Sequence, residues 1–344
     1  MKKLYVPVLA LLTLASCSKS ELANRPVVEN DMVEIMATSK ALTIETRAPF
    51  EGSIASNNTL TAVVLGSTTT ADYTTRYCDG EMTFTDDNTT PVSFATNKQY
   101  YPVSDATVYF CALYPTALAD WKDIATTAKH AIDGKTDIMA AAEVSNNKSG
   151  AMAGTVPSFT FKHLLTKLVV KVKADDDAAV GVWGNITGIT LVKADNANVN
   201  TTAVVTLKDG TATFEAPAAD GSGMKFYCID ATATPKYTEN AVDETNKITL
   251  TTTAEEAAYS LVASIDAKNV SPHLVLSVDT DLDGTKTTKT VNVDLKDAQT
   301  GSGFINSTQG KAFEITLTFK ATDIQATATV TPWEEGGNSE VEIQ

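Results

Sequence analysis

The chain has few of the side chains on which most catalytic and metal sites depend. Its 344 residues include only three histidines, His130, His163 and His273, and none has a second ligand at metal-binding spacing. No nucleophile elbow, phosphate-binding loop or dinucleotide fingerprint is present. The sequence therefore predicts a protein that is not an enzyme and that needs no metal or other cofactor. His163 is expected to be a buried, hydrogen-bonded structural residue.

Cysteine is also scarce, with four residues in the whole chain. Three of them, Cys78, Cys111 and Cys228, follow residue 47, and their odd number and wide spacing argue against a full disulfide framework. Cys111 and Cys228 lie in apolar runs and are interpreted as small core residues. A bridge between Cys78 and Cys111 remains open at this point.

Basic residues are outnumbered, since 27 lysines and arginines stand against 42 aspartates and glutamates. The formal net charge of −15 repels nucleic acid, so no nucleic-acid partner is expected. The acidic stretch 279–284 resembles the first half of a calcium loop, but its twelfth position is Thr290, where such a loop needs a glutamate. The flanking residues have the alternation of strands, so a hairpin turn is expected there.

Arginine occurs three times, and Arg47 is the sole basic residue between Lys40 and Arg76. Upstream of it, residues 32–36 and 41–44 alternate apolar with polar side chains, as half-buried strands do. Downstream, Pro49 biases Ala48 away from helix, which favours an extended connector that a protease could bind. Two interpretations stay open: an ordinary surface arginine in a loop, or the cut site of a detachable leader.

The first residues form an export signal. Lys2 and Lys3 precede an apolar run, residues 4–14, that is too short for a typical membrane-spanning helix. The run ends in Leu14-Ala15-Ser16-Cys17, the pattern in which small residues precede a cysteine that becomes lipidated. Residues 1–16 are therefore expected to be a lipoprotein signal peptide. The chain is expected to be exported, to be anchored by acyl chains at Cys17 and to reach the outer membrane.

Threonine, valine, alanine and aspartate dominate the remaining chain, and long helical patterns are scarce. This composition, with frequent turn residues, is typical of antiparallel β-sandwiches, so an all-β fold is expected. The longest apolar segment, residues 159–172, changes register near His163 and is interpreted as two strand pieces with a bend between them. The second piece is expected to cross into a new domain, and the two domains are expected to meet near residues 171–177.

The C-terminal part of the chain contains two further alternating patterns. One lies before a flexible Gly336-Gly337 pair, and the other follows it. A free strand in this region could pair with another molecule. The candidate donor positions are Ile324, Ala326, Ala328, Val330, Val341 and Ile343.

Several segments, in a common order across nearly the whole chain, resemble the fimbrillins, the Mfa-like type V pilins of Gram-negative bacteria. Each segment is weakly specific alone, and the resemblance depends on their combination. They are the lipidation motif at Cys17, Thr46-Arg47-Ala48, and residues 100–102, 110–115, 136–140, 161–165 and 310–333.

The resemblance implies two transthyretin-like antiparallel β-sandwich domains in tandem, residues 48–172 and 173–344, after a removable leader at 17–47. It also implies that a trypsin-like protease cuts the Arg47–Ala48 bond and that the chain then polymerises with other pilin subunits, identical or different. Before the cut, outer-membrane lipid would hold the chain through Cys17. A leader strand within residues 32–46 is expected to cover the N-terminal core until a donor strand replaces it.

The function expected from these features is that of a structural subunit of a surface fimbrium, which supports adhesion or biofilm formation. One alternative is a tip or accessory adhesin of the same pilus, which would accept a strand and donate none. Another is a monomeric surface lipoprotein that binds a glycan or a host ligand. Exposed aromatic platforms usually mark such a binding face, but the three tryptophans, Trp121, Trp183 and Trp333, do not cluster in the sequence.

Overall fold

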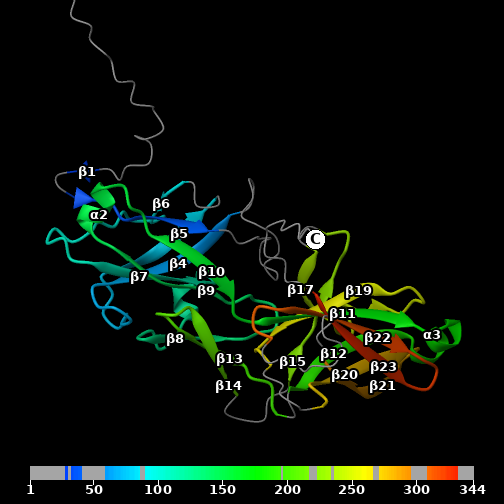
Figure 1. Ribbon diagram of the computed structural model, residues 1–344. Coiled ribbons are helices and arrows are strands. Elements are labelled where there is room, and N and C mark those ends of the chain that lie inside the picture. The colour runs from blue at the N-terminus through cyan, green and yellow to red at the C-terminus, as the bar shows by residue number, and fades with distance from the viewer. Residues whose placement is uncertain are drawn as a thin grey trace, which may run out of the picture.

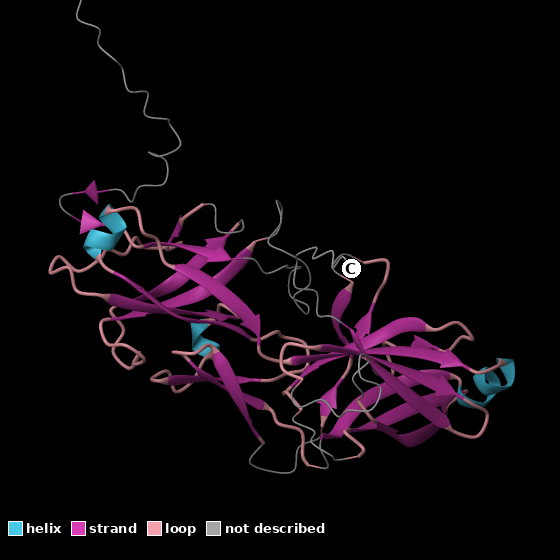
Figure 2. Cartoon of the chain, in the orientation of Figure 1, coloured by secondary structure: helices cyan, strands magenta, loops and turns pink. Residues whose placement is uncertain are grey.

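The computed structural model describes residues 28–29, 32–40, 59–85, 90–194, 197–216, 223–233, 236–265, 271–295 and 308–331. Over this part of the chain, strands dominate, and Figures 1 and 2 show them gathered into two layered bodies. The helical elements are short: η1 (Leu118–Asp120), α2 (Lys148–Met152) and α3 (Asp177–Trp183). The expected all-β fold with β-sandwiches in tandem is confirmed.

The first body is organised around a seven-stranded sheet with the order β5-β4-β7-β9-β10-β3-β6. Its pairings are antiparallel except for β3 with β10, which is parallel. The ends of the sheet approach each other, because the Ala95 N–H just after β6 donates to the Glu81 carbonyl of β5 at 2.8 Å. The strands are β3 (Met36–Lys40), β4 (Leu60–Ser67), β5 (Cys78–Phe84), β6 (Val92–Ser93), β7 (Val108–Tyr114), β9 (Met139–Asn146) and β10 (Ser158–His163).

Both faces of this sheet are buried, which explains why its strands are apolar on both sides. In β4, Ala62 and Val64 contribute to one core and Val63 and Leu65 to another, as the period of two in a strand requires. We call the first of these the leader core, because Val33, Ile35 and Ala37 belong to it together with a group of aromatic side chains.

A three-stranded sheet with the order β14-β13-β8 packs on the second face. It consists of β8 (Thr127–Ala131), β13 (Thr202–Thr206) and β14 (Thr211–Glu215), so a hairpin from the later half of the chain completes the first sandwich. Ala128, Ala203 and Val205 share a core with Val63 and Leu65. At the hairpin turn, Gly210 has a φ of 62° and lies so close to Ala142 that a Cβ atom would meet the Ala142 nitrogen at 2.7 Å.

The second body pairs a six-stranded sheet, β17-β16-β19-β11-β22-β23, with a sheet of order β15-β12-β20-β21, in which β18 also pairs with β12. The strands of the first of these are β11 (Thr166–Ala174), β16 (Tyr227–Ile229), β17 (Tyr237–Ala241), β19 (Glu255–Val262), β22 (Ala312–Phe319) and β23 (Ile324–Thr331). Those of the second are β12 (Asn185–Ala194), β15 (Met224–Lys225), β18 (Ile248–Thr249), β20 (Leu274–Leu282) and β21 (Thr285–Val293). A separate pair, β1 (Val28–Glu29) and β2 (Met32–Val33), lies at the start of the described chain.

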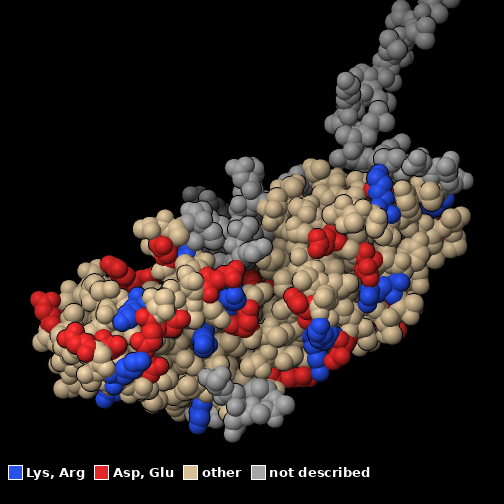
Figure 3. All heavy atoms as spheres, turned by 180° about the vertical axis from the view of Figure 1, so that it is seen from behind, with Lys and Arg blue, Asp and Glu red and all other residues tan. Residues whose placement is uncertain are grey.

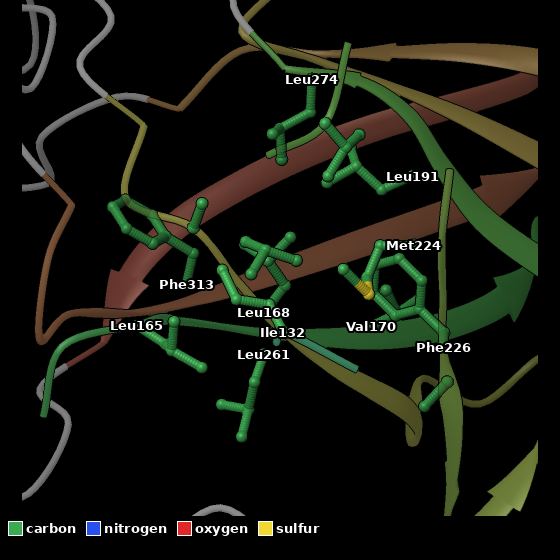
Figure 4. Packing of buried hydrophobic residues seen from close by; sticks show 14 of the residues in the cluster. Ile132, Leu165, Leu168, Val170, Leu191, Met224, Phe226, Leu261, Leu274 and Phe313 are labelled. Atoms are coloured by element: carbon green, nitrogen blue, oxygen red, sulfur yellow. The ribbon is translucent and has the colours of Figure 1, made fainter. Parts of the chain in front are cut away.

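The core of the second body lies between its two sheets. Figure 4 shows side chains of β11 and β22 directed into the same interior as side chains of β12 and β20. Among the fully buried ones are Leu168, Val170, Leu191, Leu274 and Phe313. Burial of each such side chain stabilises the fold by about 1.5–3 kcal/mol before the entropic cost of ordering.

The bend predicted near His163 lies between β10 and β11, where the chain leaves the first sheet and enters the second. His163 is largely buried, and its Nδ1 atom lies 2.6 Å from Asp137 Oδ2, as expected for a structural residue. The boundary expected at residue 172 falls inside β11, which pairs along its length with β19 and β22. Because strand pairing keeps β11 with the second body, the crossing is at residues 164–165.

Two other sequence features have local explanations. The calcium-like stretch is the turn between β20 and β21, with positive φ angles of 50° at Asp283 and 86° at Gly284, as a two-residue hairpin requires. Cys78 and Cys111 are free thiols on opposite faces of their sheet, so no bridge joins them. Burial raises the pKa of the Cys78 thiol to about 12, which keeps it protonated and unreactive.

Candidate strand-exchange site

Residues 17–47, the expected leader, contribute a strand to the interior of the first sheet. β3 lies between β10 and β6, within the stretch where the sequence predicts a pairing strand. It runs parallel to β10, with Thr38 opposite Ser158, and antiparallel to β6, with Ala37 opposite Val92. Removal of β3 would leave unpaired backbone groups on both neighbours.

The residues just before β3 are held by a second set of backbone bonds. The Ile35 N–H donates to the Gln99 carbonyl at 2.8 Å, and the Tyr101 N–H donates to the Val33 carbonyl at 2.9 Å. Glu34 lies opposite Tyr100 in an antiparallel bridge. This short stretch therefore pairs with residues 99–101 as a strand would.

Alternate leader side chains enter the leader core. Val33, Ile35 and Ala37 are exposed by 0%, 1% and 2%, and Ser39 at the next alternate position by 1%. Aromatic rings supply much of the surrounding surface: Phe84 contacts Phe159 and Phe161 edge to face, and Tyr101 contacts Phe110 in the same way. Loss of the leader would therefore open a groove lined by apolar and aromatic side chains.

One charged leader residue is buried as well. The side chain of Glu34 is 3% exposed, and Lys98 Nζ lies 2.9 Å from Glu34 Oε2. Lys98 itself is 56% exposed, so it places its ammonium group at the edge of the groove. Nearby, burial raises the pKa of the Tyr101 phenol, so this ring remains neutral. The groove is thus apolar along its floor and carries a cation at one rim.

The energetic weight of the leader is considerable. Burial of Val33 and Ile35 is worth about 1.5–3 kcal/mol each, and each backbone hydrogen bond about 0.5–1.5 kcal/mol. The covalent link keeps these contacts intramolecular. A leader that is cut from the chain keeps the same contacts but loses that advantage of effective concentration.

The predicted site residues fall in different places. Cys17, Arg47, Ala48, Val341 and Ile343 lie outside the described residues. In the sequence, Arg47 and Ala48 come after the residues of β3 and before those of β4. The other donor candidates lie on β23, in the second body, and the structure does not bring them to the leader groove.

β23 is the last strand of its sheet and, among the described strands, pairs only with β22. Ile324, Ala326 and Ala328 are partly buried against the core of the second body. Their apolar faces therefore already have a partner within the same molecule.

Sequence patterns did not identify the Glu34–Lys98 pair. The alternation of residues 32–36 places Glu34 on the face opposite Val33 and Ile35, which predicts an exposed carboxylate and not a buried one. The identity of the cation that pairs with Glu34 depends on a contact 64 residues away in the chain, which no local pattern reports.

Other kinds of site find no support in the described part of the chain. It holds no group of three or more His, Cys, Asp or Glu side chains placed to bind a metal ion. No helix within it is long and apolar enough to cross a membrane. On the face shown in Figure 3, acidic and basic side chains are interspersed.

Comparisons with known proteins agree with this architecture. A family model described as fimbrillin-like matches residues 46–333. A solved structure of a candidate cell adhesion protein from Bacteroides uniformis is 18% identical, with a TM-score of 0.50, over 88% of this chain and 99% of that one. A search of curated proteins finds no match.

Two further solved structures are similar to the chain. A fimbrial protein from Bacteroides vulgatus is 17% identical, with a TM-score of 0.46, over 88% of this chain and 99% of that one. A candidate cell adhesion protein from Bacteroides ovatus is 13% identical, with a TM-score of 0.49, over 88% of this chain and 97% of that one.

Proposed function

The chain belongs to the fimbrillin-like family, and from this premise we propose that it is a structural subunit of a surface fimbrium that polymerises by strand exchange. Family membership supports a fimbrial structural or adhesive role. The proposal adds three steps: export as a lipoprotein acylated at Cys17, cleavage of the Arg47–Ala48 bond, and replacement of the leader strand by a strand of another subunit.

The observation that carries the proposal is the position of the leader in the sheet. β3 and the residues before it fill an interior place, with Val33 and Ile35 buried, although the expected cut at Arg47 would sever them from the rest of the chain. A strand so placed keeps the precursor closed during export, because an open groove invites aggregation. Once cut, it can be displaced by a strand of matching shape.

The expected partner of the groove is another pilin subunit, and the strand would come from the C-terminal region. Because the donor and the acceptor are different surfaces of the subunit, the contact is heterologous and does not close on itself. Repetition then gives a filament at the cell surface. The outer-membrane lipid at Cys17 would hold the precursor, and the trypsin-like protease would cut it, before strand exchange begins.

Replacement of Arg47 by alanine tests the proposal. Arg47→Ala should abolish polymers while the monomer stays folded, because the leader remains covalently attached. Arg76→Ala is the matched control, since Arg76 lies on the surface with an ion pair to Asp79 and should not affect processing. Gel ladders that survive detergent report the polymer, and circular dichroism reports the fold. Protease-dependent ladders from the Arg47→Ala chain would refute the cut site.

The alternative of a monomeric glycan-binding lipoprotein finds little support among the aromatic residues. Trp121 and Trp183 are 3% and 4% exposed and belong to the core, so they form no platform, and Trp333 lies outside the described residues. A tip adhesin would differ from the proposed structural subunit only in that it donates no strand to another subunit. A tip subunit would accept a strand, yet loss of its C-terminal residues would leave assembly unchanged.

A further inference from the structure

The leader and the C-terminal segment share a tripeptide. Val-Glu-Ile occurs at residues 33–35 and again at residues 341–343, and nowhere else in the chain. We propose that residues 341–343 of a neighbouring copy take the place of residues 33–35, residue for residue. This inference rests on the proposed strand exchange and specifies the donor segment and its register.

The two apolar residues of the repeat match the deepest contacts of the leader. Val33 and Ile35 are 0% and 1% exposed within the leader core. Side chains at alternate positions of a strand point to one face, so Val341 and Ile343 would enter the same two pockets. The carbonyl of residue 341 and the N–H of residue 343 would then meet Tyr101 and Gln99, as Val33 and Ile35 do now.

The residues that flank the repeat differ between the two segments in a way that follows burial. Met32 is 38% exposed and Met36 is only partly buried. The corresponding residues of the C-terminal segment are polar, Glu340 and Gln344. Identity is thus confined to three consecutive positions, all of which are almost fully buried in the leader.

The central glutamate sets the register. Glu34 is buried beside Lys98, with 2.9 Å between Lys98 Nζ and Glu34 Oε2, and Glu342 would supply the same carboxylate. A shift of the donor by two residues in one direction would place Gln344 there, and the carboxylate would be lost. A shift in the other direction would place Glu340 there, but Ser339 would then occupy the pocket of Val33. Lys98 and the two apolar pockets together therefore select one alignment.

The other candidate donor segment lacks this feature. Between its apolar residues, β23 carries Gln325, Thr327 and Thr329, none of which is acidic. Ile324 and Ala326 also pack on the core of their own domain. The observations therefore favour residues 341–343, which lie outside the described residues, over β23.

A charge exchange tests the register directly in the cleaved full-length chain. Glu342→Lys should slow the growth of detergent-resistant polymers by at least about tenfold, because two ammonium groups would then meet at the groove. Lys98→Glu should have a similar effect through two carboxylates. The double variant, with both charges exchanged, should polymerise within about twofold of the unaltered chain.

Matched controls separate this contact from a general charge effect. Glu340→Lys makes the same charge change two residues from Glu342 and should leave the rate unaltered. Lys193→Glu is the control for Lys98→Glu, because it makes the same charge change at an exposed position of β12. Because Glu34 pairs with Lys98 in the precursor, the Glu342→Lys precursor should fold normally even if Lys98→Glu proves unstable.

The outcomes distinguish the register from the exchange itself. If Glu342→Lys polymerises as fast as the unaltered chain, or if a double variant whose precursor is folded is no better than either single one, the register is wrong while strand exchange stands. If the unaltered chain forms no polymers after cleavage, both the proposed function and this inference fail.

Discussion

At the scale of single residues, the leader is held firmly but not ideally. Glu34 Oε1 and Ser39 Oγ are buried and have no hydrogen-bond partner. A buried polar atom without a partner costs about 1–3 kcal/mol. These two atoms lower the stability that the leader adds to the sheet, which would favour the replacement that we propose.

His130 makes stability depend on pH. It lies in the three-stranded sheet, contacts Trp121 at a tilted angle with ring centroids 4.8 Å apart, and has a buried Nε2 atom without a hydrogen-bond partner. Burial lowers the pKa of His130 from its ordinary value of 6.5. The unfolded chain then binds a proton at this imidazole more readily than the folded chain does. The free energy of unfolding is therefore highest above about pH 6.5, where His130 is neutral in both states, and it falls as the pH falls.

Replacement of His130 by phenylalanine should remove that dependence. Between about pH 7 and pH 5, we expect the unfolding free energy of the unaltered chain to fall more steeply than that of His130→Phe. The two slopes should differ by at most about 1.4 kcal/mol per pH unit. Urea titrations at each pH measure both slopes. Equal slopes would show that His130 does not contribute.

At the scale of elements, the proposed exchange implies that β3 and the residues before it support the precursor but not the mature subunit. Ile35→Ala should destabilise the precursor by about 2–5 kcal/mol, because the side chain is fully buried. The same substitution should leave the heat resistance of assembled polymers unchanged, since the leader has departed. Urea unfolding of the precursor and melting of gel ladders are the two measurements.

Met32→Ala is the matched control for this element, because Met32 is 38% exposed and its loss should cost much less. Polymers that melt at a lower temperature when they carry Ile35→Ala would mean that the leader remains in the assembled subunit.

At the scale of the whole molecule, sequence patterns predict strands more reliably than their partners. The alternation in residues 32–36, the Asp-Gly turn before β14 and the bend at His163 are local signals, and the structure contains a corresponding element at each place. Pairing across long separations has no such signal. β13 joins β8 to complete the first sandwich, although β9 to β12 lie between them in the chain. β3 runs parallel to β10, from which more than a hundred residues separate it.

The candidate site follows the same division. The buried leader residues Val33 and Ile35 are readable from their alternation, whereas Lys98 depends on the folded path of the chain. The expected boundary at residue 172 failed for a related reason. β10 and β11 form one continuous apolar run, and only their different neighbours show where the first sheet ends.

Mass spectrometry of polymers isolated from the cell surface tests the replacement of the leader most directly. We predict that the subunits begin at Ala48 and that no peptide from residues 17–47 remains in the polymer. Two results would contradict the replacement of the leader by a donor strand. One is a polymer whose subunits still carry residues 32–40 in the same chain, and the other is a polymer that contains a cut leader peptide in an amount equal to that of the subunit.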